Sequence, residues 1–456
     1  MNIYKICIIL FSLMSSVFCS SSSFSGEPAQ NNTPQPYAWV MLGENGQPIV
    51  RVLTQSASCP VLLVNGQKTP LTLRAAPDMT GKTPIPALFP ERICEKSLPL
   101  GVKSVTLNGK KLPIPSRMPK RIVVLGDTGC RLKQAQVQAC NDPHRFPYWK
   151  IAQRAALWKP DLVVHLGDYH YRENPCPNGV PGCQNSPWGY GYDTWKADFF
   201  DPSRPLVSAA PWIFIRGNHE TCGRANHGWS RYFSITPFSP EKICRKRSPE
   251  TTPDIEDSYR IPLGDGAQFI VWDSSYESDG PIPQTDPRFA RYRAIYGQLA
   301  ELAQRAPYSI ALSHYPLLGM RAQPANPTLP FTGALGIQSV FRTLNPHLLP
   351  QGIQMLMGGH IHLWEQISFV GDLWPSQFIV GNSGSSLESR VFTYPLPPEM
   401  TPYAPAKIES FSTIEQEHGF TTLERLGPQK WRVQEHTVGG LVRRTCIVEG
   451  RHSSCR

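Results

Sequence analysis

The sequence predicts an α/β protein preceded by a small all-β domain, and three observations support this prediction. Short apolar runs separated by Asn-Gly turns fill residues 38–117. From residue 118 onward, mostly apolar runs alternate with segments of helical periodicity. The chain has 456 residues, which is too many for one domain of usual size. We therefore predict one domain over residues 38–117 and a second over residues 118–456.

The N-terminus has the pattern of a signal peptide, which we place at residues 1–20. An apolar stretch, Ile6–Val17, follows a basic residue and precedes small residues. Its length suits a signal-peptide core and is too short to span a bilayer. Cleavage near Cys19 or Ser20 would release an exported protein, periplasmic or extracellular; lipid modification of Cys19 is the alternative. Residues 21–37, rich in Ser, Pro and Asn, would form a flexible leader.

An even number of cysteines remains once the signal peptide is removed, because ten of the 12 lie beyond it. In an oxidising compartment this favours disulfides over free thiols or zinc sites. Spacing alone does not determine the connectivity, but pairing in chain order would close five loops. These pairs would be Cys59 with Cys94, Cys130 with Cys140, Cys176 with Cys183, Cys222 with Cys244, and Cys446 with Cys455.

The net charge of +10 is spread along the chain. The longest basic cluster, Lys242–Arg247, is interrupted by Ile243 and Cys244. This pattern favours mild attraction of a small anionic substrate over nucleic-acid binding. Beyond the signal peptide no apolar run reaches the length of a membrane span, so we expect no stable membrane insertion. The oligomeric state is left open.

Residues 38–117 are expected to form an antiparallel β-sandwich, because Asn-Gly turns join short apolar runs. No cluster of His, Asp or Glu occurs in this region, so we expect it to pack or position other parts of the chain. The predicted strands are Trp39–Leu42, Ile49–Thr54, Val61–Val64 and Val105–Leu107.

Residues 118–456 are expected to hold a sheet covered on both faces, because its strands are apolar throughout. Predicted strands are Arg121–Leu125, Leu162–Leu166, Trp212–Arg216, Ile310–Leu312 and Ile353–Met357, and predicted helices are Trp149–Trp158, Tyr292–Gln304 and Leu335–Thr343. Predicted antiparallel pairs are Tyr259–Ile261 with Gln268–Asp273, Gln366–Phe369 with Phe378–Val380, and Phe420–Leu423 with Arg432–His436.

Five short motifs follow apolar runs of this second domain, and each carries side chains that bind metals. Carboxylates suit hard cations and imidazoles suit ions such as zinc and iron. Each motif alone could be an ordinary turn, but five in one order predict two adjacent metal ions, which can activate water and hold a phosphate. The motifs are Gly126-Asp127-Thr128-Gly129, Gly167-Asp168-Tyr169-His170-Tyr171, Gly217-Asn218-His219-Glu220, Ser313-His314-Tyr315-Pro316 and Gly359-His360-Ile361-His362.

This series resembles that of the calcineurin-like metallophosphoesterases, which show Asp, Gly-Asp, Gly-Asn-His-Asp/Glu, His and Gly-His-x-His in this order. The resemblance covers about residues 120–385. More narrowly, Gly167-Asp168-x-x-Tyr171 is similar to the purple acid phosphatases, in which the tyrosine binds ferric iron. The resemblance implies a four-layer β-sandwich flanked by helices, after an N-terminal domain like those of fibronectin type III or immunoglobulins.

The resemblance also implies a role for each site residue. Asp127, Tyr171 and His362 would hold a first metal, Asn218, His314 and His360 a second, and Asp168 would bridge them. The first metal would be iron(III), and the second zinc, manganese or iron(II). A metal-bound hydroxide would attack a phosphomonoester in line, and His219 would lie near the phosphate and protonate the leaving group. The catalytic residues would be His219, Asn218 and Asp168.

Several alternatives remain open at this point. If Tyr171 is a core aromatic, or Tyr169 takes its place, the enzyme would be a metallophosphoesterase with divalent metals only. A phosphodiesterase or nucleotidase on the same scaffold is a second alternative. A non-catalytic surface-binding protein is a remote one, because such a protein would be expected to lack ligands.

The resemblance does not supply the substrate contacts, because the extra histidines of the plant-type relatives are missing. His347 is the single histidine between the fourth and fifth motifs. We expect contacts from elsewhere, with His170, His227 and Arg224 as candidates. An aromatic cluster could stack on an aromatic leaving group, although loop packing is the favoured account. The cluster is Trp188, Tyr190, Tyr192 and Trp195.

Overall fold

The computed structural model describes most of the chain beyond the predicted leader. The described residues are 36–81, 85–242, 254–278, 280–322, 330–392, 394–397 and 400–456. The predicted signal peptide, all but the end of the leader, and Cys244 lie outside them.

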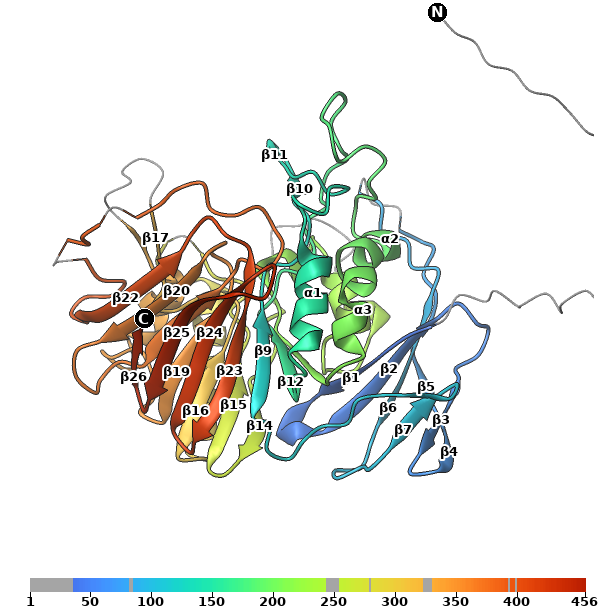
Figure 1. Ribbon diagram of the computed structural model, residues 1–456, viewed down its shortest axis with the longest axis horizontal. Coiled ribbons are helices and arrows are strands. Elements are labelled where there is room, and N and C mark those ends of the chain that lie inside the picture. The colour runs from blue at the N-terminus through green and yellow to red at the C-terminus, as the bar shows by residue number, and fades with distance from the viewer. Residues whose placement is uncertain are drawn as a thin grey trace, which may run out of the picture. The chain divides into compact units, whose positions relative to one another are not determined.

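Two large β-sheets face each other and form the centre of the molecule (Figure 1). The eleven-stranded sheet has the order β26 (His452–Cys455), β25 (Val442–Glu449), β24 (Lys430–Thr437), β23 (Gly419–Gly427), β9 (Arg121–Leu125), β12 (Leu162–His165), β13 (Trp212–Phe214), β1 (Tyr37–Leu42), β2 (Pro48–Thr54), β6 (Arg92–Ser97), β5 (Thr72–Ala75). The seven-stranded sheet has the order β14 (Tyr259–Gly264), β15 (Ala267–Val271), β16 (Tyr308–Leu312), β19 (Ile353–Gly358), β21 (Ser376–Val380), β20 (Trp364–Phe369), β22 (Ile408–Ile414).

Buried apolar side chains from both sheets, such as Val124 and Phe269, fill the space between them. Helices cover the two outer faces: Ile151 packs with Val123 on one side, and Leu299 packs with Ile270 on the other. The predicted four-layer α/β architecture is therefore confirmed. The helices are α1 (Tyr148–Leu157), α2 (Tyr192–Trp195), α3 (Asp201–Val207), α4 (Asn226–Tyr232), α5 (Pro287–Ala303) and α6 (Leu335–Phe341).

Helix α5 begins five residues before the predicted start at Tyr292. The reason is local: the side chain of Asp286 accepts a hydrogen bond from the backbone N–H of Arg288, and Pro287 occupies the first helical position. Both features favour a helix start. The three predicted antiparallel pairs form as expected, as β14 with β15, β20 with β21, and β23 with β24.

The N-terminal strands form an antiparallel sandwich with a core of its own, in which Val50, Leu62 and Leu107 are buried. One layer is the four-stranded sheet of β4 (Gln67–Pro70), β3 (Val61–Val64), β7 (Val105–Leu107) and β8 (Lys110–Lys111). The other layer is the end of the eleven-stranded sheet, because β1 pairs in parallel with β13 at Met41 and Trp212. This sandwich therefore shares a sheet with the remainder of the described chain.

Four disulfides confirm the predicted pairing in chain order. They join Cys59 to Cys94, Cys130 to Cys140, Cys176 to Cys183, and Cys446 to Cys455. Cys222 is also disulfide-bonded, and its predicted partner lies outside the described residues. Within the described part of the chain, every helix is too short or too polar to cross a bilayer.

A buried carboxyl on β24 leads to a prediction about stability and pH. Glu435 accepts hydrogen bonds from the Thr421 hydroxyl at 2.6 Å and the Asn382 amide at 2.8 Å. Burial raises its pKa from 4.5 to about 8. The folded state therefore holds this proton more tightly than the unfolded chain, and stability falls as the pH rises between these two values.

We expect Glu435→Gln to remove this contribution, so that the melting temperature of the variant changes less than that of the natural protein between about pH 5 and pH 8. The control is Glu449→Gln on β25, because Glu449 forms an exposed ion pair with Lys430. Equal pH dependence in the natural protein and Glu435→Gln would contradict the assignment.

Candidate metal centre

The predicted ligands come together where the carboxyl ends of both sheets meet. Strands β9, β12 and β13 are parallel, and Leu125, His165 and Phe214 lie in register near their ends. Asp127, Asp168 and Asn218 follow these strands, whereas His314 follows β16, and His360 and His362 follow β19. In parallel sheets such ends share one edge, where ligands commonly bind. The contacts below show that the structure brings all of these residues together.

The Tyr171 hydroxyl lies at the centre of the first group of ligands. It is 2.7 Å from Asp127 Oδ1, 2.7 Å from Asp168 Oδ2 and 2.8 Å from His362 Nε2. One phenol O–H can donate to only one of these three atoms. Burial, followed by the charges of Asp127 and Asp168, raises the pKa of Tyr171 well above its usual value. A cation shared by the four side chains would balance this group.

Asn218, His314 and His360 form the second group. Oδ1 of Asn218 is 3.0 Å from His314 Nε2 and 3.2 Å from His360 Nδ1. Oδ2 of Asp168, which contacts Tyr171, is also 3.3 Å from His314 Nε2. Asp168 therefore occupies the position between the two groups that a bridging ligand requires. Asn218 and His360 are partly exposed, so the second group lies closer to solvent.

Backbone carbonyls fix the proton positions on two of the histidines. Nδ1 of His314 lies 2.8 Å from the Leu166 carbonyl, and Nδ1 of His362 lies 2.6 Å from the Ser386 carbonyl. A carbonyl only accepts, so each Nδ1 carries hydrogen and each Nε2 directs its lone pair toward the neighbouring ligands. Each Nε2 lone pair thus faces the acceptor atoms of other predicted ligands, and a cation bound between these atoms would interact favourably with all of them.

The electrostatics of His314 agree with a cation at this place. Although burial opposes it, the Asp168 charge raises the pKa of His314 to about 9. Nε2 therefore attracts positive charge where it faces the carboxylate, and a metal ion bound there would take the place of a proton. The full donor set contains carboxylates, a phenol, an amide oxygen and imidazoles, which together fit iron, zinc or manganese.

Three of the ligand residues adopt left-handed backbone conformations. The φ angles are 56° at Asp127, 57° at Asp168 and 70° at His360. Residues other than glycine rarely adopt such angles, and the strain persists only where neighbouring contacts enforce it. Here the Asp127 side chain accepts a hydrogen bond from the His360 backbone N–H at 2.8 Å, which ties two of these positions together.

Glu220, the last residue of the third motif, holds two of the motifs in place. Its Oε2 accepts from the backbone N–H groups of Asp168 and Gly217, both at 3.0 Å. Its Oε1 accepts from the N–H of Tyr169 at 3.0 Å. Because one buried carboxylate satisfies three backbone donors, the loops after β12 and β13 are fixed relative to each other.

The glycines before the ligands are needed because the loops approach closely. A Cβ on Gly217 would lie 2.1 Å from Asp168 Oδ1, and one on Gly359 would lie 2.6 Å from Asp127 Oδ2. A Cβ on Gly126 would lie 2.2 Å from the Val380 carbonyl. The Gly in these motifs therefore provides space for the carboxylates.

His219 lies beside the predicted ligands. Its backbone N–H donates to Asp168 Oδ1 at 2.9 Å, and its ring Nδ1 is 2.7 Å from Glu173 Oε1. Arg224 Nη2 contacts the same Glu173 oxygen at 2.5 Å. Burial, followed by the Arg224 charge, lowers the pKa of His219 to about 3. The ring is therefore neutral, with its proton on Nδ1 toward Glu173.

Of the candidate substrate contacts, only Arg224 lies at the site. His170 is buried, with ring centres 5.4 Å from Tyr190 and 5.9 Å from Trp195, and His227 packs 4.2 Å from Phe89. His170 therefore belongs to the core, whereas His227 is half-buried and packs at its edge. Tyr190 and Trp195 are also buried there, which agrees with the packing account.

Sequence reasoning missed Glu173 and Arg131. Arg131 Nη1 lies 3.2 Å from His362 Nδ1, and its guanidinium carbon lies 5.2 Å from the Tyr171 ring centre. The signal in the sequence was a charged residue two positions after a motif, which is also common on a solvated surface.

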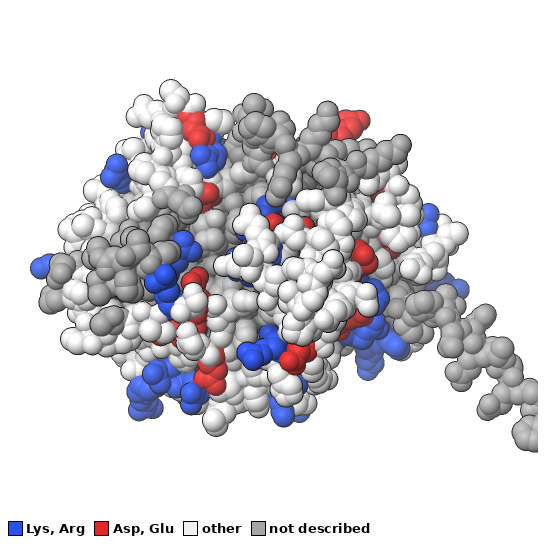
Figure 2. Space-filling model, turned by 90° about the horizontal axis from the view of Figure 1, so that it is seen from above, with Lys and Arg blue, Asp and Glu red and all other residues white. Residues whose placement is uncertain are grey.

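Figure 2 views the molecule from above, the side toward which β10 (Leu132–Lys133) and β11 (Gln136–Val137) project in Figure 1. The Lys and Arg residues coloured on this face are scattered among uncharged ones.

Comparison with known proteins agrees with this geometry. The sequence pattern of the family described as calcineurin-like phosphoesterase matches residues 120–363, just over half of the 456 residues. No curated protein matches the sequence. A purple acid phosphatase from yellow lupin (Lupinus luteus) seeds is similar over 91% of this chain and 74% of its own, with 16% identity and a TM-score of 0.59. The structure of PhoD is similar over 93% of this chain and 92% of its own, with 12% identity and a TM-score of 0.54. At these identities the likeness concerns the fold.

We expect Gly217→Ala to prevent metal binding, because the new methyl group would displace the Asp168 carboxylate. The measurement is metal content per chain after loading, together with the melting temperature; overpacking of this kind costs about 1–3 kcal/mol. The control is Gly297→Ala in α5, where an added Cβ meets nothing within 4 Å. Two bound metal ions in Gly217→Ala would contradict the prediction.

Proposed function

The chain belongs to the calcineurin-like phosphoesterase family and is a metal-dependent phosphoric ester hydrolase, and we propose that it is an exported phosphomonoesterase of the purple acid phosphatase type. The observation that carries this proposal is the Tyr171 hydroxyl, which lies within 2.8 Å of atoms from Asp127, Asp168 and His362. A tyrosine that only packs in the core would not be expected beside two buried carboxylates. A tyrosine that binds the same cation as these carboxylates would be.

Two metal ions, the number typical of this family, fit the two groups of side chains. Asp127, Tyr171 and His362 would hold the first, Asn218, His314 and His360 the second, and Asp168 would bridge. The first group offers hard anionic oxygens, which favour iron(III), and the second offers neutral donors, which favour zinc, manganese or iron(II). When bound, adjacent metal ions supply Lewis-acid charge to phosphoryl oxygens and lower the pKa of a water ligand.

We infer that His219 acts on the leaving group. Its ring is held by the Glu173 carboxylate at Nδ1 and by Arg224 Nη2, which lies 2.9 Å from Nε2, and its backbone N–H donates to Asp168. This role requires Nε2 to exchange its arginine contact for the leaving oxygen. Nε2 lies 4.0 Å from Asp168 Oδ2. Donating a proton from this neutral ring requires that the charge of a bound substrate raise its pKa, which a phosphate dianion does.

Export is supported by the cysteines. Four disulfides are formed among the described residues, and such bonds persist in oxidising compartments.

A small phosphorylated molecule is the substrate that the proposal requires.

The first test of the proposal is a visible absorption spectrum. We expect protein purified from its native compartment to show a broad violet-to-purple band, which Tyr171→Phe abolishes. Tyr169→Phe is the matched control and should keep the band, because the Tyr169 hydroxyl donates to the Ile215 carbonyl at 2.9 Å and not to the ligands. A colourless, metal-loaded and active protein would remove Tyr171 from the ligands and leave an enzyme with divalent metals.

A second test is turnover of para-nitrophenyl phosphate by Asn218→Ala. Loss of a group that only orients a metal ligand lowers activity about 10- to 100-fold. Asn218→Ala removes a proposed ligand itself, so we expect kcat to fall by more than this. Circular dichroism verifies folding, and removal of metal by a chelator should abolish turnover of the natural protein. Full activity of Asn218→Ala would contradict the second metal site.

A further inference from the structure

One positively charged side chain beside the predicted metal ligands makes no ion pair with a described residue. Arg131 contacts His362 and Tyr171, as described above. It cannot donate to His362 Nδ1, because that nitrogen already donates to the Ser386 carbonyl at 2.6 Å. Within the described part of the chain, the buried Nε of Arg131 has no hydrogen-bond partner. The positive charge of the guanidinium is therefore left for a ligand to pair.

The other two cations near this segment differ from Arg131. Lys133 is half-buried. Burial, followed by the charges of Arg224 and Arg131, lowers its pKa against the opposing charges of Glu173 and Asp168. Arg224 forms an ion pair with Glu173. Arg131 is therefore the cation at the predicted ligands that no described carboxylate pairs.

The segment that carries Arg131 and Lys133 is held rigidly. The Cys130–Cys140 disulfide closes the β10–β11 hairpin. Inside it, Gln138 Oε1 accepts from the Arg131 backbone N–H at 2.9 Å, and the Gln138 N–H donates to the Arg131 carbonyl at 2.7 Å. At the base, the Leu132 N–H donates to the Tyr171 carbonyl at 3.1 Å, so the hairpin is bonded to the residue that supplies the phenol.

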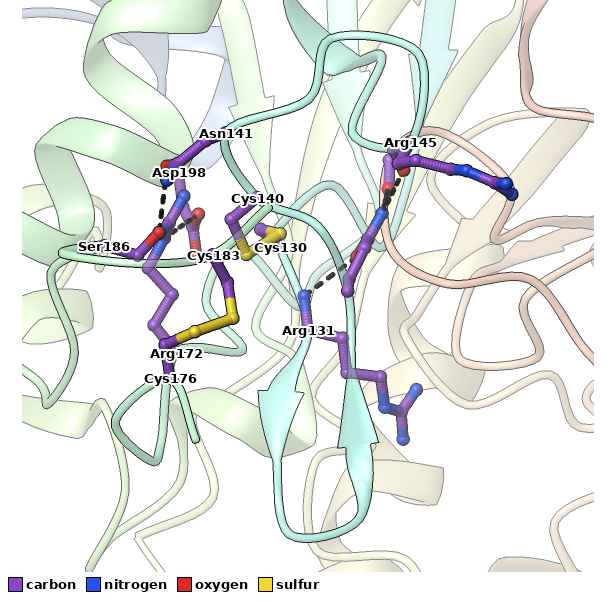
Figure 3. Close-up of a disulfide and its surroundings, with 12 residues drawn as sticks. Cys130, Arg131, Cys140, Asn141, Arg145, Arg172, Cys176, Cys183, Ser186 and Asp198 are labelled. Atoms are coloured by element: carbon purple, nitrogen blue, oxygen red, sulfur yellow. Dashed lines mark hydrogen bonds and ion pairs between the residues drawn. A yellow bond between two sulfur atoms is a disulfide. The ribbon is translucent and has the colours of Figure 1, made fainter. Parts of the chain in front are cut away.

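A second disulfide loop supports this hairpin. Cys176 and Cys183 close the loop that follows Tyr171, and Figure 3 shows this disulfide near that of Cys130 and Cys140. The Asn141 N–H donates to the Gly182 carbonyl at 2.8 Å, and the Ser186 hydroxyl donates to the Asn141 side chain at 3.0 Å. In Figure 3 the Arg131 side chain points away from its neighbouring disulfide. The loops therefore fix the backbone that directs this side chain toward Tyr171 and His362.

We propose that Arg131 binds the non-bridging oxygens of a doubly charged phosphate monoester at the metal centre and selects it over a singly charged diester. This inference rests on the proposed function. Unpaired, partly desolvated cations gain most from an anion with two charges, and a guanidinium can give two parallel hydrogen bonds to phosphate. A rigid hairpin lowers the entropy cost of that contact.

The test compares Arg131→Gln with Arg145→Gln in the metal-loaded, full-length protein. Arg145 is an exposed arginine near the same loops, and its side chain points away from Arg131 in Figure 3. Calorimetry with inorganic phosphate should show a dissociation constant at least about tenfold higher for Arg131→Gln and unchanged for Arg145→Gln, because a charge-assisted bond is lost. Metal content must be equal in all three proteins.

Steady-state kinetics separate selection from general damage. For Arg131→Gln, KM for para-nitrophenyl phosphate should rise about tenfold, while KM for bis(para-nitrophenyl) phosphate changes little. Arg131→Lys should restore part of the phosphate affinity. If Arg131→Gln fails to fold, Arg131→Lys is compared with the natural protein at equal metal content. Weaker phosphate binding by Arg131→Lys supports the inference, because lysine cannot give the two parallel hydrogen bonds of a guanidinium.

Equal phosphate affinity in the natural protein and Arg131→Gln would overturn the inference. So would a loss of metal in Arg131→Gln, because the arginine would then act by supporting Tyr171 and His362. A natural protein that binds phosphate but turns over only diesters would refute the proposed phosphomonoesterase instead, independently of the affinity comparison.

Discussion

The structure depends on how the negative charge of Asp127 and Asp168 is balanced in a buried site. Both carboxylates are almost fully buried, and both contact the same phenol oxygen. Burial of an unpaired carboxylate is strongly unfavourable, so such a site is stable only if cations, protons or hydrogen bonds compensate it. Each carboxylate also accepts a backbone N–H, from His360 and His219 respectively, which neutralises part of that charge before any metal binds.

The side chains that would balance this charge come from both sheets. Asp127, Asp168 and Asn218 come from the eleven-stranded sheet, whereas His314, His360 and His362 come from the seven-stranded one. A metal that binds ligands from both sheets links the two halves of the sandwich. Metal binding in this arrangement contributes to folding free energy as well as to chemistry. The left-handed angles at Asp127, Asp168 and His360 are the strain that this convergence imposes on the backbone.

The features that could be predicted from the sequence are those that short segments determine. Apolar runs placed the strands before each motif, and the disulfides that close short loops followed chain order. The pairing of β1 with β13 could not be predicted, because it joins segments far apart in sequence. The polar strand β26 (His452–Cys455) gave no apolar signal. His170 was a candidate substrate contact from the sequence, and its burial against Tyr190 and Trp195 could not be foreseen because it depends on tertiary packing.

The charged residues that surround the predicted ligands were the least predictable part of the site. Glu173 and Arg224 are ordinary charged residues in sequence, yet together they set the orientation and the proton of His219. Arg224 also donates to the Asn218 carbonyl at 3.0 Å, so the same guanidinium holds the backbone of a proposed ligand. Because Glu173 neutralises Arg224, the unpaired positive charge beside the predicted ligands is that of Arg131. The motifs predict where a metal binds, and Arg131 is the residue to which we assign the attraction of an anionic substrate.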